Sequence, residues 1–255
     1  GLVINLNNGY SIAAHIKLTG QFIYRDPEVS KVSKVSKKVG GELPNKFTHV
    51  IIKLKNQKSK FKNTKQNSKV KNGEAYLYYN DIRQFGWIKI VKSDKIKEIS
   101  FFRDLGPEPP VVLQSRTMEG QALLTLDKFK EIVNRSSVAI KPLIMDQKKI
   151  GGIGNIYAND ALFDSQIDPR RKAKKLSNEE IKKLYDSILK VLKKGLKNGG
   201  ASELNFVNAL GQEGKYQLHF LAYGREGEPC KVCKNPIKKI KLGGRGTYFC
   251  SSCQK

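Results

Sequence analysis

The sequence predicts a multi-domain α+β chain, and three observations support that prediction. Residues 1–104 contain short runs of alternating apolar residues, which are typical of strands. Residues 117 to about 200 instead carry apolar residues at helical spacing. The last part, residues 221–255, holds all four cysteines in two Cys-x-x-Cys pairs. We therefore expect a β-rich first domain, a helical domain at 117–220 and a small C-terminal domain.

Five strands are expected in the first domain. A turn at Asn7-Asn8-Gly9 separates the first two. The expected strands are Leu2–Leu6, Ser11–Leu18, His49–Leu54, Ala75–Tyr79 and Trp87–Val91. Because a domain seldom begins within a strand, and because the first residue is glycine, we expect that an N-terminal piece precedes this sequence.

Two lysine-rich stretches interrupt these strands. One is KVSKVSKK, which begins at Lys31, and the other runs from Lys53 to Lys71 with eight lysines and no acidic residue. Their charges repel one another, so mobile loops are expected, with a loose electrostatic grip on phosphate as an alternative. A proline-rich segment, Leu105–Pro110, then predicts a linker, because it can continue neither a helix nor a central strand.

The helical domain contains one strongly marked helix after Ser177. The spacing of Ser177 and Glu180 predicts a capping box, and Gly199-Gly200 predicts the helix end. Its expected apolar stripe is Ile181, Leu184, Ile188, Leu192 and Leu196. An earlier buried helix face is indicated by Leu123, Leu126, Phe129 and Val133.

The chain is strongly basic, with 48 lysines and arginines against 23 acidic residues and a net charge of +25. This excess predicts a polyanionic partner, nucleic acid before an anionic membrane surface. A solvated lysine-rich surface is the alternative. We expect no membrane span, because the sequence contains no sufficiently long apolar run, and no secretory signal is visible.

The cysteines are spaced as C-x2-C-x16-C-x2-C and comprise Cys230, Cys233, Cys250 and Cys253. Four thiolates in two tight pairs suit tetrahedral zinc, and they leave no open position for catalysis. One structural Zn²⁺ in a reducing cytosol is therefore predicted, holding a hairpin too small to fold alone.

The hairpin between the cysteine pairs carries Arg245 among Gly243, Gly244 and Gly246. Glycines allow a turn with positive φ and let a ligand approach closely, and the arginine fork suits phosphate. An ordinary exposed turn arginine is the alternative. A second glycine turn, Gly151 to Gly154, precedes a helix expected near Asn155. This turn is either a phosphate site at a helix N-terminus or a tight interhelical connection.

Together these segments resemble the bacterial formamidopyrimidine-DNA glycosylases. The stretch AIKPLIMDQKKIGGIGNIYANDALF is similar to their helix–two-turns–helix, and YGREGEPCKVC with GGRGTYFCSSCQK is similar to their zinc finger. LGPEP and DIRQFG fit the same family. The resemblance covers nearly the whole chain except an insertion at about 25–73. It implies an incomplete β-sandwich at 1–104, a helix–two-turns–helix domain at 117–220 and a zinc finger at 221–255.

The activity that this resemblance implies is repair of oxidised purines in double-stranded DNA by a monomeric, cytoplasmic, nucleoid-associated protein. Such enzymes turn the damaged base, 8-oxoguanine or a formamidopyrimidine, out of the stack to expose its glycosidic bond. An N-terminal proline amine then attacks C1′, a neighbouring glutamate acts as general acid and base, and β- and δ-elimination cut the strand.

Several residues match family positions that bind DNA. Arg245 matches a finger arginine that contacts phosphates at the lesion and donates a proton in δ-elimination. Asn155, after Gly154, matches a turn asparagine that binds phosphate, and Lys141 matches a DNA-facing lysine. His49 matches a phosphate-binding histidine.

Other matches concern the space left by the everted base. Arg83 and Phe85 match an arginine that pairs with the orphaned cytosine and a phenylalanine that wedges the stack. Leu18 stands where methionine is usual, which keeps an apolar wedge. Leu210 to Gly224 matches the loop that closes over the base.

The start of the chain departs from the family pattern. The family opens Pro-Glu-Leu-Pro-Glu and has a catalytic lysine before the strand that follows Gly1, and none of these has a counterpart here. The chain as given is therefore expected to bind DNA without excising a base. Two alternatives stay open: a non-catalytic homologue that binds damaged DNA, and the sister branch that prefers oxidised pyrimidines. The Arg-Gln-Phe triplet and the capping loop favour the purine branch.

Overall fold

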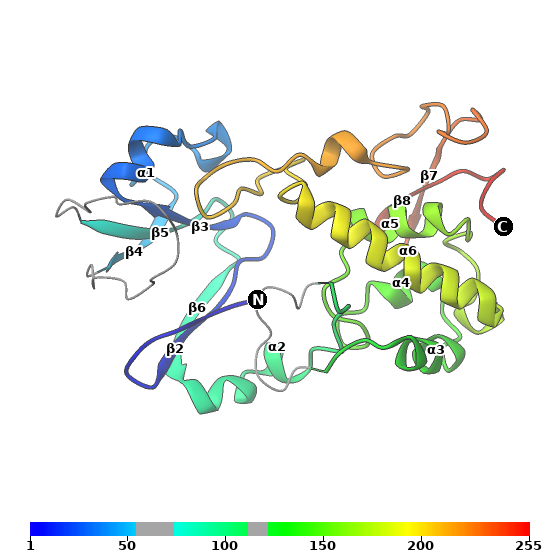
Figure 1. Ribbon diagram of the computed structural model, residues 1–255, viewed down its shortest axis with the longest axis horizontal. Helices are drawn as coiled ribbons and strands as arrows, with labels where there is room; N and C mark the ends of the chain where they lie inside the picture. Colours follow the sequence, from blue (N-terminus) through cyan, green and yellow to red (C-terminus); the bar gives the residue numbers. More distant parts are fainter. Residues whose placement is uncertain (55–73, 112–121) are drawn as a thin grey trace, which may run out of the picture. The chain divides into compact units, whose positions relative to one another are not determined.

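The computed structural model describes residues 1–54, 74–111 and 122–255 (Figure 1). The chain divides into two compact units. The first comprises Gly1–Ile96 and Asn198–Gln217, and the second comprises Lys97–Lys197 and Leu218–Lys255. Mixed sheets and helices confirm the predicted α+β class. The three-domain boundaries stay a prediction, because this division is coarser.

The first unit contains two three-stranded antiparallel sheets. One has the order β1-β2-β6 and the other the order β3-β5-β4 (Figure 1). Their strands are β1 Leu2–Asn5, β2 Tyr10–His15, β3 Gly20–Arg25, β4 Thr48–Leu54, β5 Ala75–Asp81 and β6 Trp87–Lys92. In the first sheet, Ala13 pairs with both Val3 and Lys89, so β2 is central.

Two strand predictions differ from the structure. The second strand ends at His15 rather than Leu18, because Lys17 has φ +50° and the Gly20 amide closes a turn onto the Ile16 carbonyl. Leu18 therefore lies in the turn. The strand β3 was missed because it is largely buried along both faces, which removes the alternation that marks a strand.

The lysine repeat at Lys31 is not the loop that was expected. It spans the end of α1 Pro27–Val32 and the 3₁₀ turn η1 Lys37–Val39. Asp26 caps α1 by accepting from the Val29 amide at 2.7 Å, and Pro27 fits the first helical position. Of the second lysine-rich stretch, the part after Leu54 lies outside the described residues.

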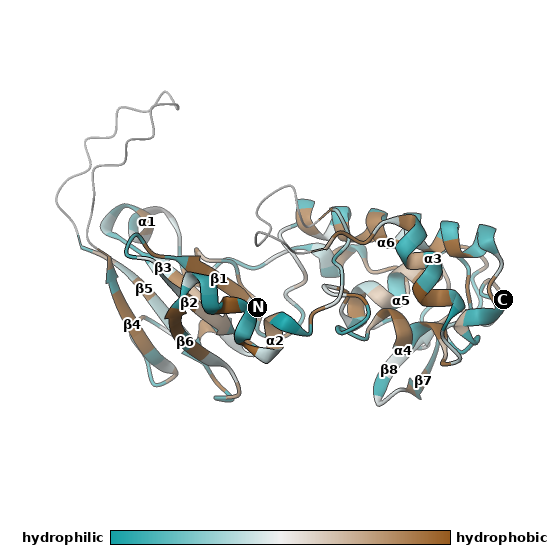
Figure 2. Cartoon of the chain, turned by 90° about the horizontal axis from the view of Figure 1, so that it is seen from below, coloured by the Kyte–Doolittle hydropathy of each residue, from teal (hydrophilic) through white to brown (hydrophobic). Residues whose placement is uncertain are grey.

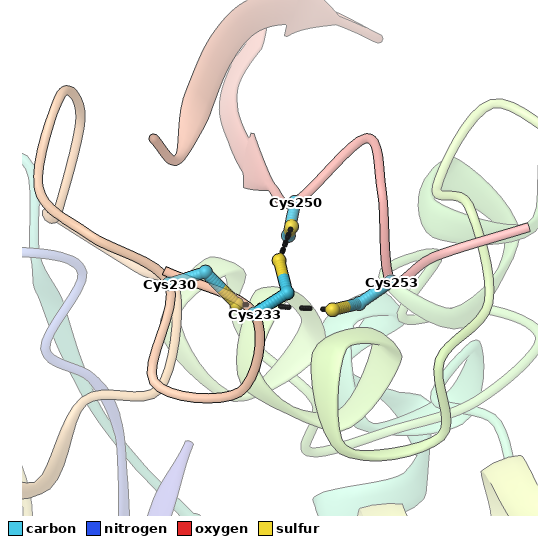
Figure 3. Close-up of side chains that lie close together, drawn as sticks. All are labelled: Cys230, Cys233, Cys250 and Cys253. Atoms are coloured by element: carbon cyan, nitrogen blue, oxygen red, sulfur yellow. Dashed lines mark hydrogen bonds between the residues drawn. The ribbon is translucent and has the colours of Figure 1, made fainter. Parts of the chain in front are cut away.

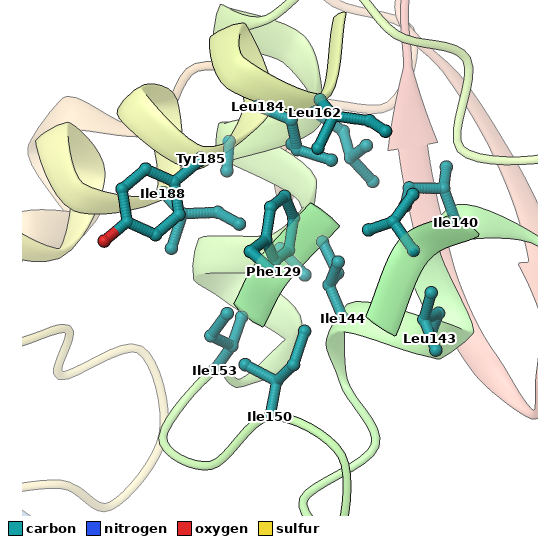
Figure 4. Packing of buried hydrophobic residues seen from close by; sticks show 14 of the residues in the cluster. Phe129, Ile140, Leu143, Ile144, Ile150, Ile153, Leu162, Leu184, Tyr185 and Ile188 are labelled. Carbon is teal, nitrogen blue, oxygen red and sulfur yellow. The ribbon is translucent and has the colours of Figure 1, made fainter. Parts of the chain in front are cut away.

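The second unit is a group of helices followed by a hairpin. Its elements are α2 Ser100–Arg103, α3 Leu126–Asn134, α4 Ile140–Ile144, α5 Asn155–Asp164, η3 Ala173–Lys175, α6 Asn178–Lys197, β7 Lys238–Leu242 and β8 Arg245–Phe249, with η2 Ser93–Glu98 and η4 Tyr216–His219 at its junctions with the first unit. The apolar core gathers around fully buried Phe129, between α3, α5 and α6 (Figure 4).

The helix α6 follows the sequence prediction closely. Ser177 and Glu180 form the capping box, with the Glu180 amide 3.2 Å from Ser177 Oγ and the Ser177 amide 2.8 Å from Glu180 Oε2. Bands of hydrophobic and of hydrophilic residues follow one another along the helix, as helical spacing of its buried residues requires (Figure 2). Leu196 is an exception, since it is 57% exposed in the last turn, beyond the core.

The segment Leu105–Pro110 is not a linker but part of the second unit, within which it is packed. The Gly106 amide donates to the Gln147 carbonyl, and Glu108 forms a β-bridge with Leu123. Leu123 is 47% exposed, and the buried residue just before α3 is Leu124 rather than the predicted Leu123.

Candidate nucleic-acid interface

The four cysteines converge at the C-terminal end of the second unit (Figure 3). All four Sγ atoms lie within 4.8 Å of one another, with Cys230 and Cys253 at 3.9 Å and Cys233 and Cys250 at 3.4 Å. Zn–S bonds of about 2.3 Å in a tetrahedron place sulfurs about 3.8 Å apart, so these donors fit one zinc ion. The site is structural, because all four positions are filled by protein ligands.

A backbone group acts on one of these thiols, that of Cys233. The Asn235 amide lowers the pKa of Cys233 to about 7, which favours the thiolate that zinc binds. The closing Gln254 joins the site to the helices, because its amide group accepts from the Cys250 amide and donates to the Ile167 carbonyl, each at 2.9 Å.

The hairpin β7–β8 presents Arg245 at its tip. Gly243 and Gly244 both have positive φ, at +57° and +75°, as a two-residue hairpin turn requires. Arg245 is exposed, and among the described residues its guanidinium has no hydrogen-bond or ion-pair partner. The turn is seated against α4, since a Cβ on Gly243 would lie 3.1 Å from Pro142.

The glycine turn leads into α5 with Gly154 as the N-cap residue. Gly152 has φ +82°, and Gly151 has no room for a side chain because a Cβ would lie 2.9 Å from the Gly106 carbonyl oxygen. Gly154 is exposed, and a Cβ there would meet nothing within 4 Å. The first amides of α5 therefore lie at an open helix N-terminus, where the helix dipole favours an anion.

Lys141 of α4 joins the helix N-terminus to the hairpin tip. Its Nζ donates to Asn155 Oδ1 at 2.7 Å, to the Gly246 carbonyl at 2.9 Å and to Thr247 Oγ1 at 2.7 Å. Asn155 completes the link by donating from Nδ2 to the Gly246 carbonyl at 3.1 Å. One ammonium group thus binds Gly246 and Thr247, which follow Arg245 in β8, and Asn155, which begins α5.

This lysine differs from the sequence expectation of a DNA-facing residue. Its side chain is only 1% exposed, and all three N–H bonds of the ammonium group are directed at protein oxygens. Burial, followed by the positive charge of Arg245, lowers the pKa of Lys141 to about 8. Lys141 therefore acts on the surface through Asn155 and the hairpin.

Two further polar residues of α5 tie the hairpin segment to the helix, and the sequence analysis missed both. Asn159 accepts from the Tyr248 amide of β8 at 2.7 Å. Asp160 is fully buried, and one oxygen accepts the amides of Leu221, Ala222 and Tyr223 at 3.0–3.2 Å. Buried polar residues on an otherwise apolar helix face were the available signal.

In the first unit, buried Asp81 organises two neighbouring loops. Its carboxylate accepts from Thr19 Oγ1 at 2.5 Å and from the amides of Arg83 at 3.3 Å and Gly86 at 2.8 Å. Burial alone would raise the pKa of Asp81, but these hydrogen bonds and that from Tyr79 lower it below its usual value. The sequence analysis did not single out Asp81.

The residues bound by Asp81 include Arg83 and are next in sequence to Leu18 and Phe85, and these three were predicted to fill the space of an everted base. Leu18 is 57% exposed beside Thr19, and Phe85 is 61% exposed between Arg83 and Gly86. The Arg83 guanidinium lies 4.8 Å from the centre of the Phe85 ring. His49 lies at the same strand end, with Nε2 2.8 Å from the Asp81 carbonyl oxygen.

The predicted residues therefore form one group in each unit. Leu18, His49, Arg83 and Phe85 lie around Asp81 in the first, while Lys141, Gly154, Asn155 and Arg245 lie around the Lys141 ammonium in the second. The predicted capping loop is shared, with residues 210–217 in the first unit and 218–224 in the second. None of the helices in the described ranges is both long and apolar enough to cross a bilayer.

Two family models match the second unit and its hairpin. Residues 105–206 match the formamidopyrimidine-DNA glycosylase H2TH domain, and residues 227–255 match the zinc finger found in FPG and IleRS. These matches define a protein of the helix–two-turns–helix and zinc-finger class.

Full-length relatives extend the match to the whole chain. The formamidopyrimidine-DNA glycosylase of Pelotomaculum thermopropionicum is 35% identical over 254 residues, which cover 100% of this chain and 78% of the relative. The chain belongs to the formamidopyrimidine-DNA glycosylase family, whose members are DNA repair enzymes.

Solved structures agree with this assignment. Lactococcus lactis Fpg in complex with DNA containing an abasic site is similar with a TM-score of 0.74 and 28% identity, over 99% of this chain and 78% of that one. The same enzyme in complex with DNA containing Fapy-dG gives a TM-score of 0.73 and 27% identity over the same shares.

Proposed function

We propose that this protein binds damaged double-stranded DNA and takes part in removing oxidised purines, 8-oxoguanine and formamidopyrimidines, with strand cleavage by β- and δ-elimination. The three hydrogen bonds of Lys141 carry this proposal. They connect an exposed arginine, an asparagine and an open helix N-terminus, which are three kinds of phosphate-binding group.

In this proposal the two groups of residues have separate tasks. Arg245, Asn155 and the α5 amides at Gly154 bind backbone phosphate at the lesion, and Arg245 donates the proton in δ-elimination. His49 binds a further phosphate. Leu18 and Phe85 enter the stack and Arg83 faces the orphaned base, while residues 210–224 close over the everted one. Leu18 and Phe85 are exposed apolar side chains next to Thr19 and Gly86, which bond to a buried carboxylate, and this supports an apolar wedge.

Binding is tested on a duplex with a tetrahydrofuran abasic-site analogue and on the intact duplex. We expect the wild-type chain to prefer the damaged duplex, and Arg245→Ala to weaken that binding about tenfold, as loss of a charge-assisted hydrogen bond would. The slope of log K against log salt should also fall by about one. The charge-matched control is Lys193→Ala, on the exposed side of α6. Equal effects of the two substitutions would contradict the phosphate role.

The chemistry is tested on protein expressed from its complete reading frame. Duplexes with 8-oxoguanine and with thymine glycol separate the purine from the pyrimidine branch, and borohydride traps a Schiff base if an amine attacks C1′. Arg245→Ala should leave a strand end that stops after β-elimination. A protein that binds damaged DNA, is never trapped and excises neither base would instead be the non-catalytic homologue.

A further inference from the structure

Within the first unit, residues 24–38 hold residues 202–213 in place. The two segments are far apart in the sequence, and the first includes the whole lysine repeat, residues 31–38, that was expected to be a loop. Ile23 and Val39 pack against Val207 in a small buried cluster, with Val35 beside it. Residues 23–39 therefore have a packed partner in Val207.

Three consecutive backbone carbonyls of the later segment accept hydrogen bonds from the earlier one. The pairs are Tyr24 N to Ala209 O at 2.7 Å, Ser33 Oγ to Leu210 O at 3.4 Å and Ser36 N to Gly211 O at 2.8 Å. These contacts fix the backbone of residues 209–211, the middle of the segment.

A side-chain cluster then fixes the residues on either side. Glu213 accepts from Ser36 Oγ at 2.5 Å and forms a 2.9 Å ion pair with Lys38, whose Nζ also donates to the Ser202 carbonyl. The Ser36 hydroxyl, followed by Lys38, lowers the pKa of Glu213. Lys38 thus joins both ends of the 202–213 segment.

The held segment is itself tightly turned. Asn208 Oδ1 accepts the amides of Leu210 and Gln212, each at 2.9 Å, and Gly211 has φ +77°. A segment that is turned by its own side chain and held at three carbonyls loses little further freedom when it contacts a ligand. Such preorganisation strengthens binding because less ordering accompanies it.

We propose that Ser36 and Lys38 are positioning residues for base recognition, which act through Glu213 to hold residues 210–213, the start of the segment that closes over an everted purine. The inference rests on the proposed function, in which residues 210–224 contact the base. It assigns part of the specificity for the damaged base to residues 24–38, rather than to residues that touch the base.

The test compares two damaged duplexes that differ in whether a base is present. One contains 2′-fluoro-8-oxoguanine, whose glycosidic bond resists cleavage, and the other the tetrahydrofuran analogue, which has no base to close over. The variant is Ser36→Ala with Lys38→Met. The charge-matched control is Lys34→Met, an exposed lysine of the same repeat. Amide exchange at residues 210–212 and in β5 is followed in both.

We expect the variant to lose about five- to tenfold in affinity for the base-containing duplex, as loss of one or two hydrogen bonds would. Affinity for the abasic duplex should stay within twofold, exchange should quicken at 210–212 alone, and the control should match the wild type.

Three outcomes would overturn the inference. Equal losses on both duplexes would reduce the cluster to general stabilisation of the unit. Unchanged affinities with quicker exchange would show that holding the segment is irrelevant to recognition. A control that loses as much as the variant would leave only an effect of charge. By contrast, a wild type that binds neither damaged duplex better than intact DNA would refute the proposed function itself, and this inference with it.

Discussion

Replacing Lys141 with methionine removes a buried ammonium group while keeping an unbranched side chain of similar length. Each acceptor that loses Lys141 keeps another contact: Asn155 Oδ1 with Asn159, the Gly246 carbonyl with Asn155, and the Thr247 hydroxyl with the Arg245 carbonyl. We therefore expect Lys141→Met to fold.

The magnitude follows from the pKa of Lys141, which falls from 10.5 to about 8 on folding. At pH 7 the amine is protonated in both the folded and the unfolded chain. As the pH rises from 8 towards 10.5, the folded protein releases the proton first, so the unfolded chain binds more protons and the free energy of unfolding increases. Between pH 7 and pH 9.5 this group should add about 2 kcal/mol to wild-type stability.

The assay is urea unfolding of the wild type and Lys141→Met at both pH values, with zinc bound. Tyrosines and cysteines titrate in both proteins, so the difference between the two isolates Lys141. We expect the wild type to gain about 2 kcal/mol relative to the variant at pH 9.5. Equal pH dependence in the two proteins would refute the reasoning, since burial of the charged Lys141 side chain would then not destabilise the folded protein.

Three further predictions concern other buried groups. Arg25 is 8% exposed, and its terminal nitrogens have no hydrogen-bond partner among the described residues. Arg25→Met should therefore raise the free energy of unfolding, measured in urea, by about 1–3 kcal/mol. A lower free energy of unfolding in the variant would contradict this. Asp81→Asn should lower the free energy of unfolding by about 2 kcal/mol at pH 7. The lowered pKa of Asp81 reflects stability that is present above pH 3.8 and is lost as the pH falls through the folded pKa. A difference between wild type and variant that is the same in urea titrations at pH 7 and pH 3 would contradict this. Cys250→Ser, or zinc removal by a chelator, should unfold the hairpin and abolish the preference for the abasic duplex. Amide spectra report the unfolding and binding measurements report the preference. A preference that is retained would contradict the role of the hairpin.

The parts that the sequence predicted correctly depend on local signals. The cysteine spacing defines the zinc ligands, Ser177 with Glu180 defines a helix start, and the glycine turn before Asn155 defines another. Each helix signal lies within a few residues of the helix start that it specifies. The zinc signal lies in two Cys-x-x-Cys pairs that one metal ion must join.

The parts that the sequence did not predict depend on contacts between distant residues. Lys141 is buried because Gly246 and Thr247, more than a hundred positions later, supply its acceptors. The lysine repeat is ordered because Glu213 and the carbonyls of 209–211 lie against it. Charge and periodicity alone cannot show such partners, so the lysine repeat was interpreted as a mobile loop, and Lys141 was expected to face DNA from the family resemblance.

The central claim is that Arg245, placed at the hairpin tip by the contacts of Lys141, binds a backbone phosphate beside the lesion. The most direct measurement is a double-mutant cycle between Arg245→Ala and a neutral methylphosphonate at each phosphate flanking the abasic analogue. We predict that at one phosphate the loss of affinity caused by the two changes together is about tenfold smaller than the product of the two separate losses. Independent effects at every flanking phosphate would contradict the claim.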